Sequence, residues 1–324
     1  MVEKFRREAP PPDQPKPEDF GFDLDRALES VVALQAEIPE DAFTASILGV
    51  KRVGSGVVIG ENGLVLTIGY LMTEAQSVWL TSAGGRLIPA HALAVDQETG
   101  FGLVQALDRS ALPALDLGRS SQARLGDPVI VAAGGRKQFL RANIVGKHEF
   151  VGYWEYLLEE AIFTAPAHPF WGGAGLIGSD GKLLGIGSLH VEQAMEQGER
   201  RDVNMIAPID LLAPVLGDLL SRGRVDKPPR PWLGLYSTES DGRIIVAGVA
   251  EGGPAAAAGV RRGDIVCAVG DSSVASLGDF YRKVWSRGPA GAEIPIEVER
   301  DERRVWLRIR STDRSGYFKK PRLH

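Results

Sequence analysis

The segment from His168 to Leu176 comes closest to a reactive site by residue type. It reads His-Pro-Phe-Trp-Gly-Gly-Ala-Gly-Leu and lies between apolar runs at 161–164 and 183–187. This pattern predicts a strand, a tight glycine-rich loop and a second strand. Because glycine adopts positive φ angles easily, such a loop can aim several backbone N–H groups at one anion. The segment contains no Ser, Thr or Cys, so it predicts an anion site without a nucleophile.

His168, Ser188 and His190 are the nearest candidates for other chemistry. The two imidazoles could act as acid and base or share a metal ion, and Ser188 could attack as a nucleophile. A metal site usually needs three or more protein ligands, and no carboxylate stands at a suitable spacing here. We therefore favour loop or pocket-wall roles for all three, and expect no metal and no cofactor. Cys267 lies in an apolar strand pattern, which is typical of a buried structural thiol.

The bulk composition is that of a globular protein with more than one domain. The chain has 324 residues, 44% hydrophobic and 24% charged, with a formal net charge of -5. We expect no nucleic-acid partner, because no basic surface is indicated. A single cysteine excludes an intrachain disulfide, and no stretch approaches the roughly 20 apolar residues of a membrane span. The first residues lack the apolar core of a secretory signal, which predicts a cytoplasmic protein, or a periplasmic one if the sequence is a processed form.

Short β-rich runs separated by turn residues predict a mainly β fold. Asn62-Gly63 between the runs 54–60 and 64–67 is a strong hairpin signal. A polar, proline-rich stretch then divides the chain into two units. The predicted organisation is a flexible proline-rich tail over 1–20, a β-rich unit over 21–222, a linker over 223–230, a second unit over 231–312 and a polar tail over 313–324.

Several ordered motifs carry a resemblance to a known family. They are Gly54–Ile59 with Gly63–Thr67, Val95–Thr99, Leu117–Ser120, Leu125–Val129, Asp180–Ile186, Trp232–Leu235, Gly253–Ala255, Ala258–Val260 and Arg262–Ile265. In this order the chain resembles the HtrA (DegP-like) family of trypsin-fold serine proteases with a C-terminal PDZ domain. The resemblance covers roughly residues 21–312. It implies a chymotrypsin/trypsin-like double β-barrel followed by a PDZ domain, an α+β module built on a small, partly open barrel.

The resemblance also indicates which residues stand at the catalytic positions. Tyr70 stands where the family has its histidine, Gly100 where it has its aspartate, and Gly172 where it has its serine. Glycine cannot attack, and a tyrosine with a pKa near 10 is a poor base at neutral pH. An oxyanion hole alone leaves roughly 10³–10⁴-fold catalysis over water. This implies a pseudoprotease with no intact triad. Phe170 and Trp171 either fill the former active-site cleft or form an apolar binding surface, and we favour filling.

The PDZ resemblance implies peptide binding. A PDZ groove receives an extended C-terminal peptide as an added strand, and loop N–H groups capture its carboxylate. The corresponding loop here is Trp232, Leu233, Gly234 and Leu235. The opposite wall is the predicted helix 277–287, with Phe280 and Val284 as lining residues. The alternative is that these apolar side chains simply form the domain core.

Three functional hypotheses follow from the sequence. The first is an inactive HtrA-like protein that binds peptide or protein C-termini or unfolded segments, as an adaptor or chaperone-like factor. The second is a serine-type endopeptidase with an unconventional site. The third is an assembly scaffold that associates with itself or with an active protease relative.

Overall fold

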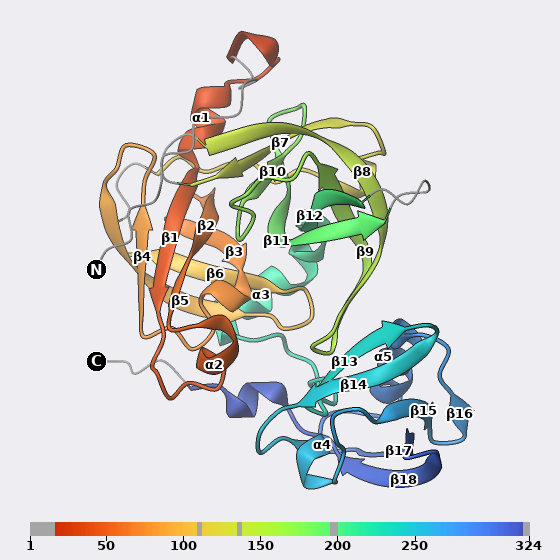
Figure 1. Ribbon diagram of the computed structural model, residues 1–324. Helices are drawn as coiled ribbons and strands as arrows, with labels where there is room; N and C mark the ends of the chain where they lie inside the picture. The colour runs from red at the N-terminus through yellow and green to blue at the C-terminus, as the bar shows by residue number, and fades with distance from the viewer. Residues whose placement is uncertain (1–16, 109–111, 135–137, 195–199, 320–324) are drawn as a thin grey trace, which may run out of the picture. The chain divides into compact units, whose positions relative to one another are not determined.

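The computed structural model describes residues 17–108, 112–134, 138–194 and 200–319, which form two compact units (Figure 1). The first unit contains the described parts of the chain up to His148 and from Glu160 to Val225. The second contains Asp226–Lys319 together with Glu149–Glu159, a hairpin contributed from far upstream. We call residues 149–159 the hairpin tip. Residues 1–16 of the tail predicted over 1–20 lie outside the described residues, and Pro17–Asp19 form the short helix η1.

Two closed antiparallel barrels make up the first unit, the first in red to orange and the second in yellow-green to green (Figure 1). The first barrel has the strand order β1-β2-β3-β6-β5-β4. Its strands are β1 (Val31–Glu37), β2 (Lys51–Gly60), β3 (Leu64–Ile68), β4 (Ser77–Thr81), β5 (Leu87–Val95) and β6 (Phe101–Ala106). As the Asn62-Gly63 pair predicts, β2 and β3 form a hairpin in which Gly63 has φ +80°. The side chains of Val57, Leu66 and Leu103 are fully buried.

The second barrel has the strand order β10-β11-β12-β9-β8-β7. Its strands are β7 (Pro128–Ala133), β8 (Gln138–Gly152), β9 (Tyr156–Ala165), β10 (Gly175–Ile177), β11 (Leu183–Ala194) and β12 (Arg200–Pro208). The predicted strand–loop–strand around residue 172 is present as β9, the glycine loop and β10. The far ends of β8 and β9 continue into the hairpin tip.

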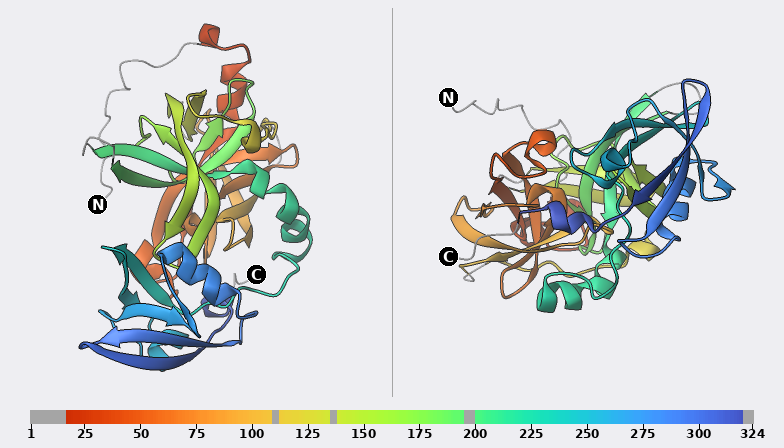
Figure 2. Two further views of the ribbon diagram at one scale, coloured as in Figure 1. Left: turned by 90° about the vertical axis from the view of Figure 1, so that its right-hand side faces the viewer. Right: turned by 90° about the horizontal axis from the view of Figure 1, so that it is seen from below.

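Helices are few and short in the first unit. They are η1 (Pro17–Asp19), α1 (Leu24–Glu29), α2 (Ala45–Leu48), η2 (Gly69–Leu71), η3 (Ser120–Gln122), η4 (Ile209–Leu211) and α3 (Ala213–Arg222). Helix α3 packs beside β5 through its buried face, which includes Val215 and Leu219, and lies on the outside of this unit in both views of Figure 2. None of the helices described is long and apolar enough to cross a membrane.

The second unit is built on one sheet with the strand order β13-β14-β15-β17-β18. Its elements are β13 (Leu235–Ser240), β14 (Arg243–Val249), α4 (Pro254–Ala257), β15 (Ile265–Val269), β16 (Ser272–Ser273), α5 (Leu277–Trp285), β17 (Glu293–Arg300), β18 (Arg303–Arg310) and η5 (Arg314–Tyr317). The core combines inward residues of the strands with the apolar face of α5. The mainly β prediction is confirmed for both units.

The segment after β18 differs from the polar tail predicted for 313–324. Residues 313–319 are ordered in the second unit through η5. The Tyr317 ring meets that of Trp232 with centroids 4.9 Å apart, and its hydroxyl donates to Gly252 O at 3.2 Å. The polar composition of the segment does not predict this packing, in which the Tyr317 ring meets Trp232 and the Nε atom of Arg314 is buried.

Candidate functional site

Tyr70, Gly100 and Gly172 lie close together in the first unit. The N–H of Gly69 donates to the carbonyl of Gly100 at 2.7 Å, which places Tyr70 beside Gly100. A Cβ atom added at Gly172 would lie 2.9 Å from the Tyr70 hydroxyl oxygen. The two barrels therefore bring three positions that are far apart in sequence to one place.

Tyr70 is fixed at both ends. Its hydroxyl donates to the carbonyl of Ser188 at 2.9 Å, and the guanidinium of Arg52 donates to its backbone carbonyl at 2.6 Å. Burial raises the pKa of the phenol above its ordinary value, and a hydrogen bond from Trp171 offsets this only in part. The phenol stays protonated at neutral pH, so Tyr70 can donate a hydrogen bond there but cannot accept a proton as a base.

Three N–H groups of the glycine loop donate to neighbouring protein groups. The N–H of Phe170 donates to His168 Nδ1 at 3.0 Å, that of Gly173 to Gly187 O at 2.8 Å, and that of Ala174 to Trp171 O at 3.0 Å. Burial lowers the pKa of His168 to about 4, so the ring is neutral and its Nδ1 is an acceptor. These three donors are satisfied within the protein, as buried backbone groups generally must be.

Phe170 and Trp171 are both expected to fill the cleft around Tyr70, and the structure places only Trp171 there. The Trp171 ring stacks on His190 with centroids 5.3 Å apart, and its indole hydrogen-bonds Tyr70. Trp171 therefore covers the phenol. Phe170 is 48% exposed and fills no cleft, because its backbone N–H is held by His168 and its side chain points outward.

His168, Ser188 and His190 each contact other residues. Within the described ranges, no hydrogen bond joins any two of them and no group of three or more His, Cys, Asp and Glu side chains could hold a metal ion. His190 Nε2 instead lies 3.8 Å from an Asp202 carboxylate oxygen.

In the second unit, burial raises the pKa of the Cys267 thiol, which donates to Ile265 O.

The loop before β13 is a second concentration of backbone N–H groups, and here they converge on a carboxylate. The N–H groups of Leu233, Gly234 and Leu235 donate to one oxygen of Glu155 at 3.2, 2.7 and 2.9 Å, and Leu233 also reaches the other oxygen at 2.9 Å. Gly234 has φ +76°, the left-handed conformation that allows successive N–H groups to face one point. Trp232 pairs with Thr312 through two backbone hydrogen bonds, which fixes the start of the loop.

Glu155 lies in the turn of the hairpin tip, and sequence reasoning missed it. Burial raises the pKa of its carboxyl to about 7, although the loop N–H groups and Arg314 act in the opposite direction. Arg314 was missed as well, since it falls in the predicted tail. Its Nε is buried and has no hydrogen-bond partner among the residues the structure describes. No motif within 149–159 marks this segment as a ligand of the loop.

The predicted sides of the groove are the loop 232–235, which leads into β13, and the helix α5. Phe280 and Val284 are 0% and 1% exposed and belong to the core, as do Leu233 and Leu235. Two side chains of α5 meet the hairpin tip, Arg282, whose guanidinium pairs with Glu149 and Glu159, and Tyr281. The Tyr281 hydroxyl donates to Gly152 O at 3.0 Å and accepts the N–H of Glu155 at 3.2 Å. Tyr281 is 1% exposed and belongs to the same core cluster, so the apolar pattern of the helix does not distinguish it from Phe280 and Val284.

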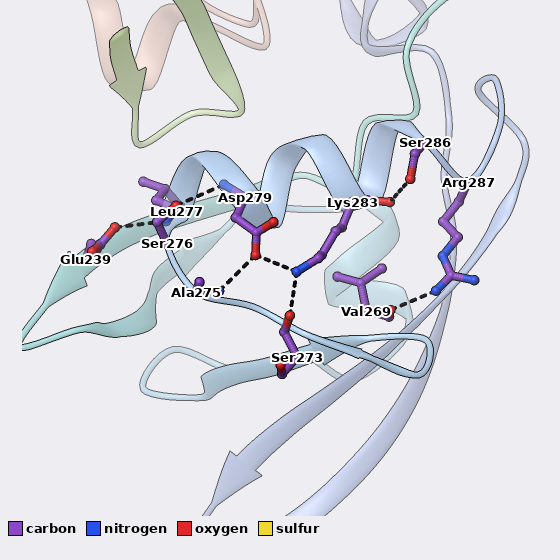
Figure 3. Close-up of polar contacts among 10 residues, drawn as sticks. All are labelled: Glu239, Val269, Ser273, Ala275, Ser276, Leu277, Asp279, Lys283, Ser286 and Arg287. Atoms are coloured by element: carbon purple, nitrogen blue, oxygen red, sulfur yellow. Dashed lines mark hydrogen bonds and ion pairs between the residues drawn. The ribbon is translucent and has the colours of Figure 1, made fainter.

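Helix α5 is joined to β13 at its amino-terminal end (Figure 3). Ser276 Oγ accepts the N–H of Asp279 at 3.1 Å, and Glu239 Oε2 accepts that of Leu277 at 2.9 Å. Asp279 in turn accepts the N–H of Ala275 at 2.9 Å and pairs with Lys283 (Figure 3). The strand residue Glu239 thus ties β13 to α5.

Comparison with known proteins agrees with both units. Residues 54–186 match the family model of the trypsin-like peptidase domain, and residues 231–310 match that of the PDZ domain. The chain is 23% identical over 314 residues to the serine endoprotease DegS of Salmonella typhimurium, covering 90% of this chain and 85% of that protein. It is 22% identical over 331 residues to the serine protease Do-like HtrA of Bacillus subtilis, covering 92% and 73% respectively.

Among solved structures, an HtrA-type protease AlgW with decapeptide aligns with a TM-score of 0.54 and 22% identity, covering 92% of this chain and 98% of that one. The chain thus combines a trypsin-like peptidase domain with a PDZ domain, and it is similar over most of its length to HtrA-type proteases.

Proposed function

We propose that this chain is an HtrA-like protein without proteolytic activity that binds the carboxyl-terminal ends of peptides or unfolded segments through the loop 232–235. In this role it acts as an adaptor or a chaperone-like factor. The proposal has two parts, a binding site in the PDZ domain and a lost reaction in the peptidase domain, and each has its own support.

The observation that carries the binding part is the convergence of three successive N–H groups, from Leu233 to Leu235, on one carboxylate oxygen. A free peptide terminus offers the same group, followed by an extended backbone that can pair with an exposed strand. The nearby guanidinium of Arg314 adds a positive charge that favours an anion. The similar HtrA-type protease AlgW has been solved with a decapeptide, which agrees with a peptide ligand for this kind of protein.

The lost reaction is supported by the residues that meet around Tyr70. Acyl transfer from a serine needs a hydroxyl, an imidazole that takes its proton and a carboxylate that orients the imidazole. By resemblance, Gly172, Tyr70 and Gly100 stand at these three positions. A hydroxyl-bearing side chain at Gly172 would already crowd the Tyr70 oxygen with its first carbon, so the phenol occupies the space of the missing nucleophile.

The second candidate is a serine endopeptidase, because the curated relatives carry that name. The two are separated by treating the purified protein with a fluorophosphonate probe and by measuring casein hydrolysis. We expect no labelling and no hydrolysis above a heat-treated sample. Stoichiometric labelling would contradict the loss of activity. Association into an assembly, with itself or with an active relative, is checked by light scattering.

The binding part is tested by calorimetry with a panel of peptides in two forms, with a free and with an amidated C-terminus. We expect binding only of the free acids. Gly234→Ala should weaken it, since a Cβ there would lie 3.2 Å from Ala250 Cβ and the φ of +76° is strained for alanine. The matched control is Gly242→Ala, which has a similar φ of +69° but open space around it. If free and amidated peptides bind alike, the loop is not a carboxylate site.

A further inference from the structure

The hairpin tip contacts the PDZ loop in the manner of a bound peptide. Its Glu155 carboxylate accepts the N–H groups of Leu233, Gly234 and Leu235, as a terminal carboxylate would. Two residues before Glu155, the carbonyl of Tyr153 accepts the N–H of Ser237 in β13 at 2.9 Å. A carboxylate in the loop and a main-chain hydrogen bond to the following strand are the two elements of peptide addition.

The side chains around the tip complete this arrangement. Val151 packs against the core of the second unit, and the Tyr153 ring meets that of Tyr236 with centroids 6.1 Å apart. Tyr281 of α5 bonds the backbone at Gly152 and Glu155. The tip is thus held by both β13 and α5.

The backbone conformation of Glu155 is unfavourable for glutamate, which indicates that the contacts of its side chain stabilise the turn. Its φ is +60°, a left-handed conformation that glycine and asparagine adopt more readily than glutamate. A glutamate at such a turn position is disfavoured by the backbone alone. Its four hydrogen bonds to the loop supply the compensating interaction.

We infer that the hairpin tip is a built-in ligand of the PDZ domain, and that a carboxyl-terminal peptide must displace Glu155 to bind. This inference rests on the proposed peptide-binding function and adds its regulation. Because the tip belongs to the same chain, its effective concentration at the loop is in the millimolar range expected for short tethers. A peptide then binds with an affinity reduced by the fraction of molecules in which the loop is free.

The test compares the wild type with Glu155→Gly, Glu155→Gln and Glu160→Gln. The glycine variant suits the positive φ and removes the ligand, while the glutamine variant keeps the shape and removes the charge. Glu160→Gln is the matched control, since Glu160 is an exposed β9 carboxylate paired with Lys147 at 3.0 Å. Thermal melts establish that each variant is folded.

Two measurements are made on each protein. The first is calorimetry with the free-acid peptide panel, where we expect Glu155→Gly to bind at least about tenfold more tightly than the wild type and the Glu160→Gln control. The second is hydrogen exchange of the amides of Leu233, Gly234 and Leu235. We expect it to be at least about tenfold faster in Glu155→Gly without peptide, and intermediate in Glu155→Gln.

The outcomes separate this inference from the proposed function. Equal peptide affinity in the wild type and Glu155→Gly, or equal exchange of the loop amides, would overturn the inference while leaving peptide binding in place. If the loop amides exchange faster in Glu155→Gly but no variant binds any peptide, the proposed function is overturned. The hairpin tip would then be a structural part of the PDZ domain and not a displaceable ligand. Faster exchange together with tighter binding supports both.

Discussion

The buried carboxyl of Glu155 makes the stability of the second unit depend on pH in a defined direction. Burial is the main cause that raises its pKa, from an ordinary value of 4.5 to about 7. Between these values the native state holds a proton that the unfolded state has released. The free energy of unfolding therefore falls as pH rises through this window, and the contribution is fully present only below about pH 4.5.

The size of the effect follows from the same two values. The window spans about 2.5 pH units, and each is worth about 1.4 kcal/mol, so the total loss is about 3 kcal/mol. Tyr236 and Tyr281 also face Glu155, but burial raises the pKa of both phenols above an ordinary value of 10, so neither titrates in this window. Arg314 is the neighbouring cation, and it is present in both the wild type and the Glu155→Gln variant used in the assay.

The assay is denaturant unfolding of the wild type and Glu155→Gln at several pH values from about 4.5 to about 8.5. Subtracting the two free energies cancels every other titrating group, including His168 in the first unit. We expect the wild-type advantage to shrink by about 3 kcal/mol up to about pH 7.5 and then to stay level. A difference that grows with pH would refute the reasoning, because it would mean that the loop N–H groups and Arg314 outweigh burial and hold the carboxylate charged.

Two further predictions concern the backbone of each unit. Gly173→Ala should destabilise the first unit by at least about 2 kcal/mol, because the φ of Gly173 is +75° and the new Cβ would lie 1.9 Å from the carbonyl oxygen of Ser55. Denaturant unfolding measures this loss. The control Gly217→Ala, in open space on α3, should stabilise the unit by about 0.5–1 kcal/mol. Ser276→Ala should cost about 1 kcal/mol, because the side chain caps α5 through the N–H of Asp279; an unchanged midpoint of thermal unfolding would show that the cap contributes nothing.

Much of the architecture is predictable from the sequence because it depends on local patterns. Asn62-Gly63 defines a hairpin by its turn chemistry, and the short β-rich runs define a mainly β fold. The pairing of the strands into two barrels came from the resemblance. Periodicity identifies the inward side chains of a strand but not its neighbours.

The parts that could not be predicted depend on contacts between distant residues. Glu155 meets a loop 78 to 80 residues further along the chain, and no spacing rule connects them. Arg314 stands in a polar segment whose composition indicates a tail, yet the guanidinium is buried beside that carboxylate. The hydrogen bonds of the glycine loop near Gly172 show the same limit. Glycine content shows that N–H groups can converge, but not which acceptors they find.

The two glycine-containing loops therefore differ in how their donors are satisfied. Around Gly172, the N–H groups of Gly173 and Ala174 donate to backbone carbonyls, so freeing them would mean breaking the pairing of the loop with its own strands. At Leu233–Leu235 the donors meet one side chain on a turn, and a single displacement of Glu155 would leave all three free for another carboxylate. A site that one group can vacate and another can enter is a binding site, whereas a loop closed by its own backbone is part of the scaffold. On this ground the proposed peptide site belongs to the loop 232–235.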